Sequence, residues 1–289
     1  MKQLLFITGL FIGLTENLTG QNLPTRWDEL VASDWAKALI DSDSTCILPI
    51  GVLEKHGPHA PIGTDLIRVR EYALRATKAE YAVVFPDYFY GQINEAKHQP
   101  GAFALPARVM WDLLEATCDE IARNGFKKIL IVNGHGGNPE FLHFFMQTRL
   151  EKRRDYAVFL FEEREADPEF VQQVAKLTTT DLRNGDHAGS IETSDILYPR
   201  PDLVKLDRAK NESGQRLNRL SLKNVYTPIG WYAGYPNHYD GDGSKASKEL
   251  GKLTVEHVVS SLAQVLKVIK EDRKTLALQK EFYDRVDAK

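Results

Sequence analysis

The sequence lacks the features that mark most nucleic-acid-binding and membrane-spanning proteins. Its 289 residues include 37 Lys and Arg against 40 Asp and Glu, which gives a formal net charge of −3, and no basic block occurs. Nucleic acids and anionic membrane surfaces are therefore not expected partners. Beyond the amino terminus, no apolar run is long enough to cross a bilayer. What remains is an ordinary globular composition, 43% hydrophobic and 27% charged.

Linkers, cysteines and nucleophile motifs are also scarce. No stretch rich in Pro, Ser or Gly divides the chain, so one domain over residues 21–289 is expected. The two cysteines, Cys46 and Cys118, have no Cys-x-x-Cys partner, and two buried thiols without a metal role are expected. The chain contains no Gly-x-Ser-x-Gly motif and no cysteine in a catalytic context. Neither a serine nor a cysteine nucleophile is therefore indicated.

Residues 1–20 have the pattern of a secretory signal peptide. Lys2 precedes the apolar run 4–14, and small and polar residues follow as far as Gly20. This pattern predicts cleavage near Gly20, export to the periplasm and no membrane association after the signal is removed. Because Glu16 is present and no Ala-x-Ala site occurs, a buried or disordered amino-terminal segment remains an alternative.

Apolar runs alternate with amphipathic segments, which predicts an α/β fold with a mainly parallel sheet. Strands are expected at 45–53, 81–85, 128–132 and 156–161. Helices are expected at 35–40, 66–79, 108–124, from 139 onward, at 167–178, from about 190 to 197, and at 244–272, followed by a frayed helical tail. In such folds, ligands bind at the carboxyl ends of the strands. The aromatic loop 87–106 and the Gly-rich segment 230–243 are candidate pocket walls, although loop 87–106 would also fit a rim that only packs.

The stretch from Glu54 to Asp65 directly follows the first expected strand. Glu54 and His56 are two positions apart, so they point to the same side of an extended chain, and Asp65 can return there after a Gly/Pro turn. His59 lies in the same turn. Taken alone, this stretch fits either a metal site or an acidic, His-bearing surface loop.

Two further motifs carry possible ligands. His135 follows the strand at 128–132 within Asn-Gly-His-Gly-Gly-Asn, where glycines let the backbone pass close to a bound ligand. His187 and Glu192 lie five positions apart, which suggests a loop His and a Glu in the first turn of a short helix. A solvated turn and helix start is the alternative for this pair. His238, in contrast, is expected at the surface or the rim of the pocket.

Imidazole and carboxylate groups together suit zinc, manganese or Fe(II). The three motifs supply the candidates Glu54, His56, Asp65, His135, His187 and Glu192. Of these, Glu54, His56, Asp65, His135 and Glu192 are the predicted metal ligands. An acidic bridging group such as Asp65 would suit two ions about 3.5–4 Å apart, which together activate a water molecule. The expected cofactor is therefore one or two divalent ions.

The motifs at 48–65, 133–138 and 186–194 resemble, in the same order, those of the creatininase family of metal amidohydrolases. A weaker pattern at 243–251 extends the resemblance, which runs from about Leu48 to His257. It implies a three-layer α/β/α fold with a mainly parallel central sheet, a metal site at the strand ends and a homo-oligomer, often a hexamer.

The resemblance also implies roles for single residues. It makes Glu54, His56, Asp65 and His135 metal ligands, with Asp65 bridging if two ions bind. His187 matches the family's His that handles protons during catalysis, and it is the predicted catalytic residue.

Two departures from the family pattern affect the pocket. Creatininase proper has a ligating Glu two residues after the second-motif His, and this chain has Gly137 there. Either the second ion is lost or weakly bound, or Glu192 supplies the missing carboxylate; Glu192 is the preferred interpretation. The long loop reads Glu-Ala-Lys-His-Gln-Pro-Gly-Ala over 95–102, where the family usually has a His ahead of Pro-Gly-Thr. Creatinine itself is therefore not the expected substrate.

Three functions compete at this point. The leading hypothesis is a metal-dependent hydrolase that cleaves the C–N bond of a small amide or cyclic amide. The second is hydrolytic ring opening of a keto-sugar or keto-cyclitol on the same metal site. The third is a protein that binds a metal and a ligand without turnover, which the intact ligand set disfavours.

Overall fold

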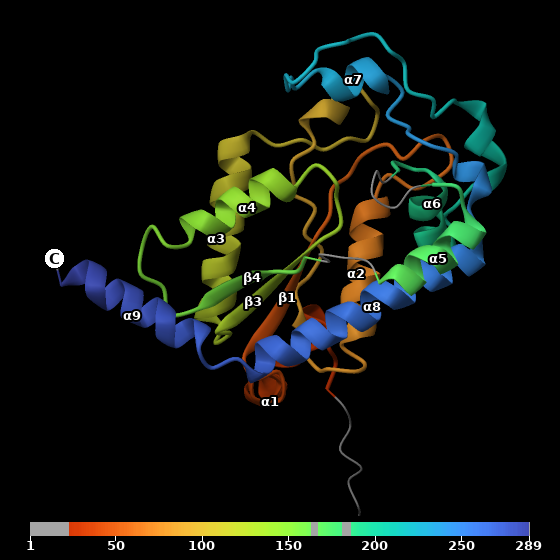
Figure 1. Ribbon diagram of the computed structural model, residues 1–289. Helices are drawn as coiled ribbons and strands as arrows, with labels where there is room; N and C mark the ends of the chain where they lie inside the picture. Colours follow the sequence, from red (N-terminus) through yellow and green to blue (C-terminus); the bar gives the residue numbers. More distant parts are fainter. Residues whose placement is uncertain (1–22, 163–166, 181–185, 289) are drawn as a thin grey trace, which may run out of the picture.

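The computed structural model describes residues 23–162, 167–180 and 186–288 (Figure 1). The signal peptide expected at 1–20 lies outside these residues, so its cleavage and the export of the protein stay predictions. Within the described ranges, no helix is both long and apolar enough to span a membrane.

A parallel four-stranded sheet forms the centre of the described chain, in the order β2-β1-β3-β4. Its strands are β1 (Thr45–Ile50), β2 (Val83–Val84), β3 (Lys128–Asn133) and β4 (Ala157–Leu160). In the register of β1 and β3, Ile50 pairs with Asn133. Because parallel strands end at the same edge, this pairing brings the chain that follows β1 next to the chain that follows β3. The first and second motifs therefore start side by side.

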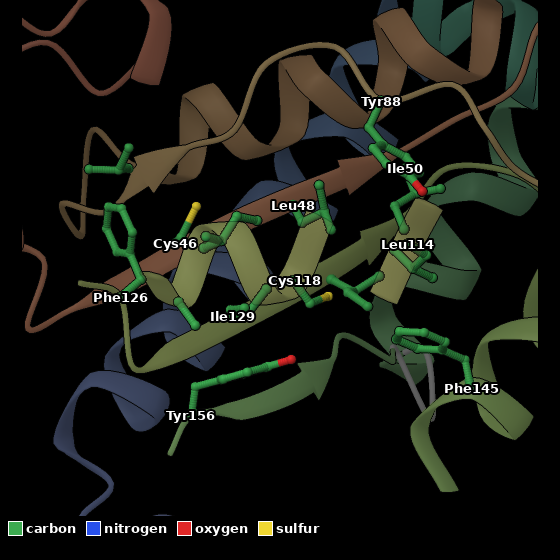
Figure 2. Close-up of a cluster of buried hydrophobic side chains, with 14 of the residues drawn as sticks. Cys46, Leu48, Ile50, Tyr88, Leu114, Cys118, Phe126, Ile129, Phe145 and Tyr156 are labelled. Carbon is green, nitrogen blue, oxygen red and sulfur yellow. The ribbon is translucent and has the colours of Figure 1, made fainter. Parts of the chain in front are cut away.

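One face of the sheet packs against α3 (Ala107–Arg123) and α4 (Pro139–Thr148). Leu48 of β1 and Ile129 of β3 meet Leu114 and Cys118 of α3 on this face, and all four are fully buried (Figure 2). Alternate strand residues supply this layer because successive side chains of a strand point to opposite faces.

The other face packs against α2 (Thr64–Ala76) and α8 (Lys248–Glu271). Ile47 and Leu130, the strand residues between those of the first face, are buried here with Val69 of α2 and Leu262 of α8. The two helix pairs lie on opposite sides of the sheet in Figure 1. This arrangement confirms the three-layer α/β/α fold with a parallel central sheet.

The remaining elements surround these layers. The other α-helices of the described chain are α1 (Trp35–Asp41), α5 (Pro168–Leu177), α6 (Ser190–Leu197), α7 (Gly230–Gly234) and α9 (Thr275–Asp287). Short 3₁₀ helices are η1 (Trp27–Glu29), η2 (Ala32–Asp34), η3 (Asn94–Ala96), η4 (Leu206–Asn211) and η5 (Gly243–Lys245).

Two expectations away from the site have clear outcomes. Cys46 and Cys118 are both buried and free, as expected. The tail is a regular helix, α9, and not a frayed one. The buried Tyr283 holds it to the body, because its hydroxyl donates to the carbonyl of Arg149 at 2.9 Å.

Candidate metal centre

The site lies beyond the carboxyl ends of β1 and β3. β1 ends at Ile50, earlier than expected, so Glu54 and His56 come from irregular chain and not from the strand. Gly51 follows the last residue of β1, and a Cβ at this position would lie 2.5 Å from the backbone of Leu66 in α2. The absence of a side chain therefore lets the first turn of α2, which carries Asp65, pack against the end of β1.

The first group of possible ligands is Glu54, Asp65 and His135. Nδ1 of His135 lies 2.8 Å from Oε1 of Glu54 and 3.0 Å from Oδ2 of Asp65. All three side chains are buried. Two carboxylates and one imidazole nitrogen thus converge on one point, where a divalent ion of the zinc or manganese type would find suitable donors.

The second group is His56, Asp65 and Glu192. Nε2 of His56 lies 3.3 Å from Oδ1 of Asp65 and 3.5 Å from Oε2 of Glu192. Asp65 belongs to both groups and turns a different oxygen to each. A carboxylate in this position can bridge two ions.

Buried polar atoms without partners support a cation at this place. Oε1 of Glu54, Nε2 of His56 and Oδ2 of Asp65 are inaccessible to solvent, and although Nδ1 of His135 lies close to both carboxylate oxygens, none of the three atoms makes a well-aligned hydrogen bond within the described residues. Buried polar groups are otherwise almost always paired, because leaving one unpaired costs about 1–3 kcal/mol. The donor set therefore fits the metal that the sequence predicts.

The electrostatics of the cluster favour positive charge. Burial by itself lowers the pKa of His56, but Glu192 and Asp65 outweigh burial and raise this pKa well above its usual value. Burial likewise opposes protonation of His135, whereas Glu54 and Asp65 raise its pKa well above the usual value. Three carboxylates thus attract positive charge into a space that a divalent ion would neutralise.

His56 is oriented for ligation by its own backbone. Its Nδ1 lies 3.2 Å from the carbonyl oxygen of Glu54, and because a carbonyl only accepts, Nδ1 carries the proton. The lone pair of the neutral ring is then on Nε2, the nitrogen that faces Asp65 and Glu192. Metal-binding histidines are commonly held in this way.

His187 lies within ligand distance of Glu54 and His56, and these three residues form a further possible ligand group. Its ring is held differently from that of His56. Its Nε2 donates to the carbonyl oxygen of Lys55 at 2.8 Å, so Nδ1 of the neutral ring is free to accept a proton. Nδ1 lies 3.8 Å from Oε2 of Glu192, and the ring centroid lies 4.4 Å from that of His56. Burial lowers the pKa of His187, and Glu54 only partly opposes this effect.

The two carboxylate oxygens of Glu192 have different partners. Nη1 of Arg68 lies 3.0 Å from Oε1, while Oε2 faces His56 and accepts from the backbone N–H of Ala188 at 2.7 Å. Burial raises the pKa of Glu192, but Arg68 and His56 outweigh burial and lower it. Glu192 is therefore held as a carboxylate next to His56.

Gly137 leaves no room for the carboxylate that creatininase proper has at that position. A Cβ there would lie 2.4 Å from Nε2 of His135 and 3.0 Å from Oε1 of Glu95. Any side chain would need His135 to move. Glu192, which is already directed at His56 and Asp65, is thus the better source of the missing ligand.

The expectation for His238 was wrong. This residue is 1% exposed, and its Nε2 hydrogen-bonds with Oε2 of Glu54. No local spacing reveals the contact, because 184 positions separate the two residues. His59 stands apart from the cluster: its Nε2 bonds with the hydroxyl of Thr193 at 2.8 Å, and it belongs to none of the ligand groups.

Comparison with known proteins shows the family to which the chain belongs. Residues 20–266 match the family described as creatininase, creatinine amidohydrolase. A creatinine amidohydrolase of Pseudomonas putida is 25% identical over 83% of this chain and 95% of its own. A mycofactocin precursor peptide peptidase of Mycolicibacterium smegmatis is 30% identical over 56% of this chain and 60% of its own. A 3-dehydro-scyllo-inosose hydrolase of Thermotoga maritima is 24% identical over 78% of this chain and 77% of its own.

Solved structures show the same fold. A manganese creatininase superimposes with a TM-score of 0.72 at 23% identity, covering 86% of this chain and 99% of that one. A mutant creatininase of the Zn-Zn type gives a TM-score of 0.71 at 23% identity, with the same coverage. With a family match over most of its length and a cluster suited to the zinc or manganese of its structural neighbours, the chain belongs to the creatininase family of metal-dependent amidohydrolases.

Proposed function

We propose that this protein hydrolyses the C–N bond of a small amide or cyclic amide with one or two zinc or manganese ions. The observation that supports the proposal best is the pair of ligand groups that share Asp65 and contain buried polar atoms without partners. Buried polar atoms without partners destabilise the folded protein, and a bound cation would remove this penalty.

Each ion would have its own set of residues. Glu54, Asp65 and His135 would hold one ion, and His56, Asp65 and Glu192 would hold the other. Divalent ions supply two kinds of chemistry in such a site, since they lower the pKa of water and polarise a carbonyl group. Each of these two groups contains two carboxylates, whose negative charge would attract the ion.

His187 would carry protons between the water and the departing nitrogen. Nε2 carries the proton of the neutral ring and donates it in a hydrogen bond to the carbonyl of Lys55. Nδ1 is therefore free to accept a proton from water as the new C–O bond forms. The same Nδ1–H can then be donated to the amide nitrogen as the C–N bond breaks, which restores neutral His187. The hydrogen bond to Lys55 holds the ring in one orientation throughout.

The names of the relatives favour amide substrates over ketones. A creatinine amidohydrolase and a precursor peptide peptidase both indicate cleavage of a C–N bond. The 3-dehydro-scyllo-inosose hydrolase supports the second candidate, ring opening of a keto-cyclitol, since the same ions could polarise a ketone. Creatinine is not our proposed substrate, because Gly137 and the loop 95–102 depart from the creatininase pattern next to the ligands.

The proposal is tested by elemental analysis of the purified protein followed by a substrate screen. We expect one or two Zn or Mn per chain and turnover of a member of an amide and lactam panel. Turnover confined to keto-sugars would replace the amide with the second candidate. Binding of these compounds without any turnover would instead identify a non-catalytic binding protein.

The metal contents of two histidine variants, one in the proposed site and one at the surface, test the ligand assignment. His135→Ala should lose most of its bound metal, whereas His143→Ala should keep it, because the His143 side chain is 55% exposed and lies outside every ligand group. Equal metal contents in the two variants would contradict the assignment.

Periplasmic location and assembly into a homo-oligomer, such as a hexamer, belong to the same proposal. The amino-terminal pattern supports export, and the family resemblance supports assembly. Sequencing the amino terminus of the mature protein after cell fractionation tests the first. Light scattering of the purified protein tests the second, and a monomer at micromolar concentration would contradict it.

A further inference from the structure

A chain of hydrogen bonds runs from the helix α7 to Glu54. Nε1 of Trp231 donates to Nδ1 of His238 at 3.0 Å, and Nε2 of His238 bonds with Oε2 of Glu54. Glu54 follows β1, whereas Trp231 lies on the short helix α7, at the top of Figure 1. The buried imidazole ring of His238 hydrogen-bonds with both ends and so connects α7 to Glu54.

The chemistry of the three groups fixes the direction of both bonds. An indole N–H can only donate, so Nδ1 of His238 must be the accepting nitrogen and carries no proton. The proton of the neutral ring is then on Nε2, which donates it to the carboxylate of Glu54. Trp231 thus selects the one neutral tautomer that can hold Glu54, since with the proton on Nδ1 neither bond would form.

The two oxygens of the Glu54 carboxylate have different surroundings. Oε2 is held by His238, while Oε1 has no hydrogen-bond partner among the described residues and lies 2.8 Å from Nδ1 of His135. One oxygen is anchored and the other is directed into the cluster. A ligand that is anchored before the ion arrives loses less rotational freedom on binding.

The backbone around His238 is built to keep the ring in place. His238 has a φ of +55°, a left-handed conformation that few residues other than glycine adopt, and such conformations persist where the surroundings enforce them. Its N–H bonds with the carbonyl of Tyr235 at 3.0 Å. The carbonyl of Pro236 accepts from Gln99 at 2.9 Å and lies 2.8 Å from Nε2 of His98, which ties this turn to the loop 87–106.

We propose that His238 and Trp231 are positioning residues for the metal ligand Glu54, and that the affinity for the ion depends through them on α7. The inference rests on the proposed function only in that Glu54 binds the ion. Trp231 also lies edge-on to His187, with ring centroids 5.8 Å apart. The segment that orients a metal ligand is therefore also beside the residue proposed to transfer protons.

The coupling must act in both directions. If α7 in its observed place strengthens metal binding, then the bound ion must stabilise α7 in that place by the same free energy. Adding Zn²⁺ or Mn²⁺ to the metal-free protein should slow amide hydrogen exchange at 230–238. The same ion should have a smaller effect in Trp231→Phe.

The central test is the dissociation constant for Zn²⁺, measured by competition with a chromophoric chelator on the full chain. Loss of a group that orients a metal ligand weakens metal binding about 10- to 100-fold, so His238→Ala should do so. Trp231→Phe keeps an aromatic ring and removes the N–H, and it should weaken binding about 2- to 10-fold, as expected for one lost hydrogen bond. His238→Gln offers an amide N–H to Glu54 and should restore part of the loss.

Tyr232→Phe is the matched control, because it changes the neighbouring residue of α7 outside the hydrogen-bond chain and should leave the constant unchanged. In the double variant Trp231→Phe with His238→Ala, binding should be no weaker than in His238→Ala alone, since both act through one contact. Circular dichroism and thermal melts check that each variant folds.

Two results would count against the proposals, and they differ. If the wild-type protein bound no Zn²⁺, the proposed function itself would fail. If the wild type bound Zn²⁺ while His238→Ala and Trp231→Phe stayed within twofold of it, only the positioning role would be overturned.

Discussion

Two clusters of buried charge lie on either side of Arg68, and they differ in how their polar atoms are satisfied. In the metal centre, Oε1 of Glu54 and Nε2 of His56 have no hydrogen-bond partner within the described chain. In the second cluster, Asp195 is fully engaged: Oδ2 accepts from the hydroxyl of Tyr72 at 2.7 Å, and Oδ1 accepts from the hydroxyl of Thr254. Both clusters are buried and both are acidic.

The difference separates a binding site from a structural network. Burial and charge are common to both clusters, so neither property identifies function. Unpaired atoms by themselves do not identify function either, since Nε of Arg68 and Nη1 of Arg149 are also buried without a hydrogen-bond partner among the residues that the structure describes. What distinguishes the metal centre is that its unpaired atoms are carboxylate oxygens and an imidazole nitrogen within ligand distance of one another. Arg68 connects the two clusters, with Nη1 at 3.0 Å from Glu192 and 3.7 Å from Asp195.

The largest effect is expected from replacing Asp65, the residue that belongs to both ligand groups of the metal centre. Asp65→Ala should abolish binding of both ions and lower kcat/KM by about 10³-fold or more, since metal ions supply several kcal/mol of transition-state stabilisation. Elemental analysis and a steady-state assay on the identified substrate measure the two effects. Retention of the wild-type metal content would show that Asp65 is not a ligand.

The converse change should affect stability and leave the metal in place. Asp195→Ala leaves the buried hydroxyl of Tyr72 without its acceptor and removes a carboxylate beside Arg68, so it should destabilise the fold by about 3 kcal/mol. Urea denaturation measures the loss, and elemental analysis of the folded variant should give the wild-type stoichiometry. A variant that lost its metal at full stability would reverse the roles of the two clusters.

Glu192 lies at the boundary between the clusters, and its replacement tests which of them it serves. Glu192→Gln keeps the shape of the side chain but removes its charge, and the stoichiometry should fall by about one ion in a two-ion site. The ion held by Glu54, Asp65 and His135 should remain. Unchanged stoichiometry would assign Glu192 to the Arg68 network alone.

The smallest expected effect comes from a single hydroxyl of the structural network. Tyr72→Phe removes one hydrogen bond to Asp195, whose other oxygen stays paired with Thr254. The free energy of unfolding should fall by about 1 kcal/mol, and metal binding should not change. A loss of metal affinity in this variant would mean that the two clusters are coupled.

Much of this fold could be predicted from sequence periodicity. The run 128–132, apolar on both faces, became β3, and the amphipathic run 108–124 became α3 almost residue for residue. β2 is shorter than expected, with two residues, since Pro86 follows closely and offers no N–H to continue the pairing. Such local features follow from residue type and spacing.

Part of the candidate site could be predicted for the same reason. Glu54, His56 and Asp65 lie within twelve positions, and His135 directly follows a strand. The carboxyl ends of parallel strands lie at one edge of the sheet, so these four residues were expected to meet there. His238 and Arg68 could not be found in this way. Their partners are 184 and 124 positions away, and neither residue stands in a motif of ligand spacing.

By itself, then, the sequence determined the α/β layers, the strand ends and the types of ligand, because these depend on contacts between near neighbours. Only the tertiary structure decided that Asp65 belongs to both ligand groups, that Glu192 joins His56 in one of them, and that His238 anchors Glu54. The physical reason is that directions of side chains depend on how α2, α6 and the 230–243 segment pack around the edge of the sheet. That packing is a property of the whole core and of no single motif.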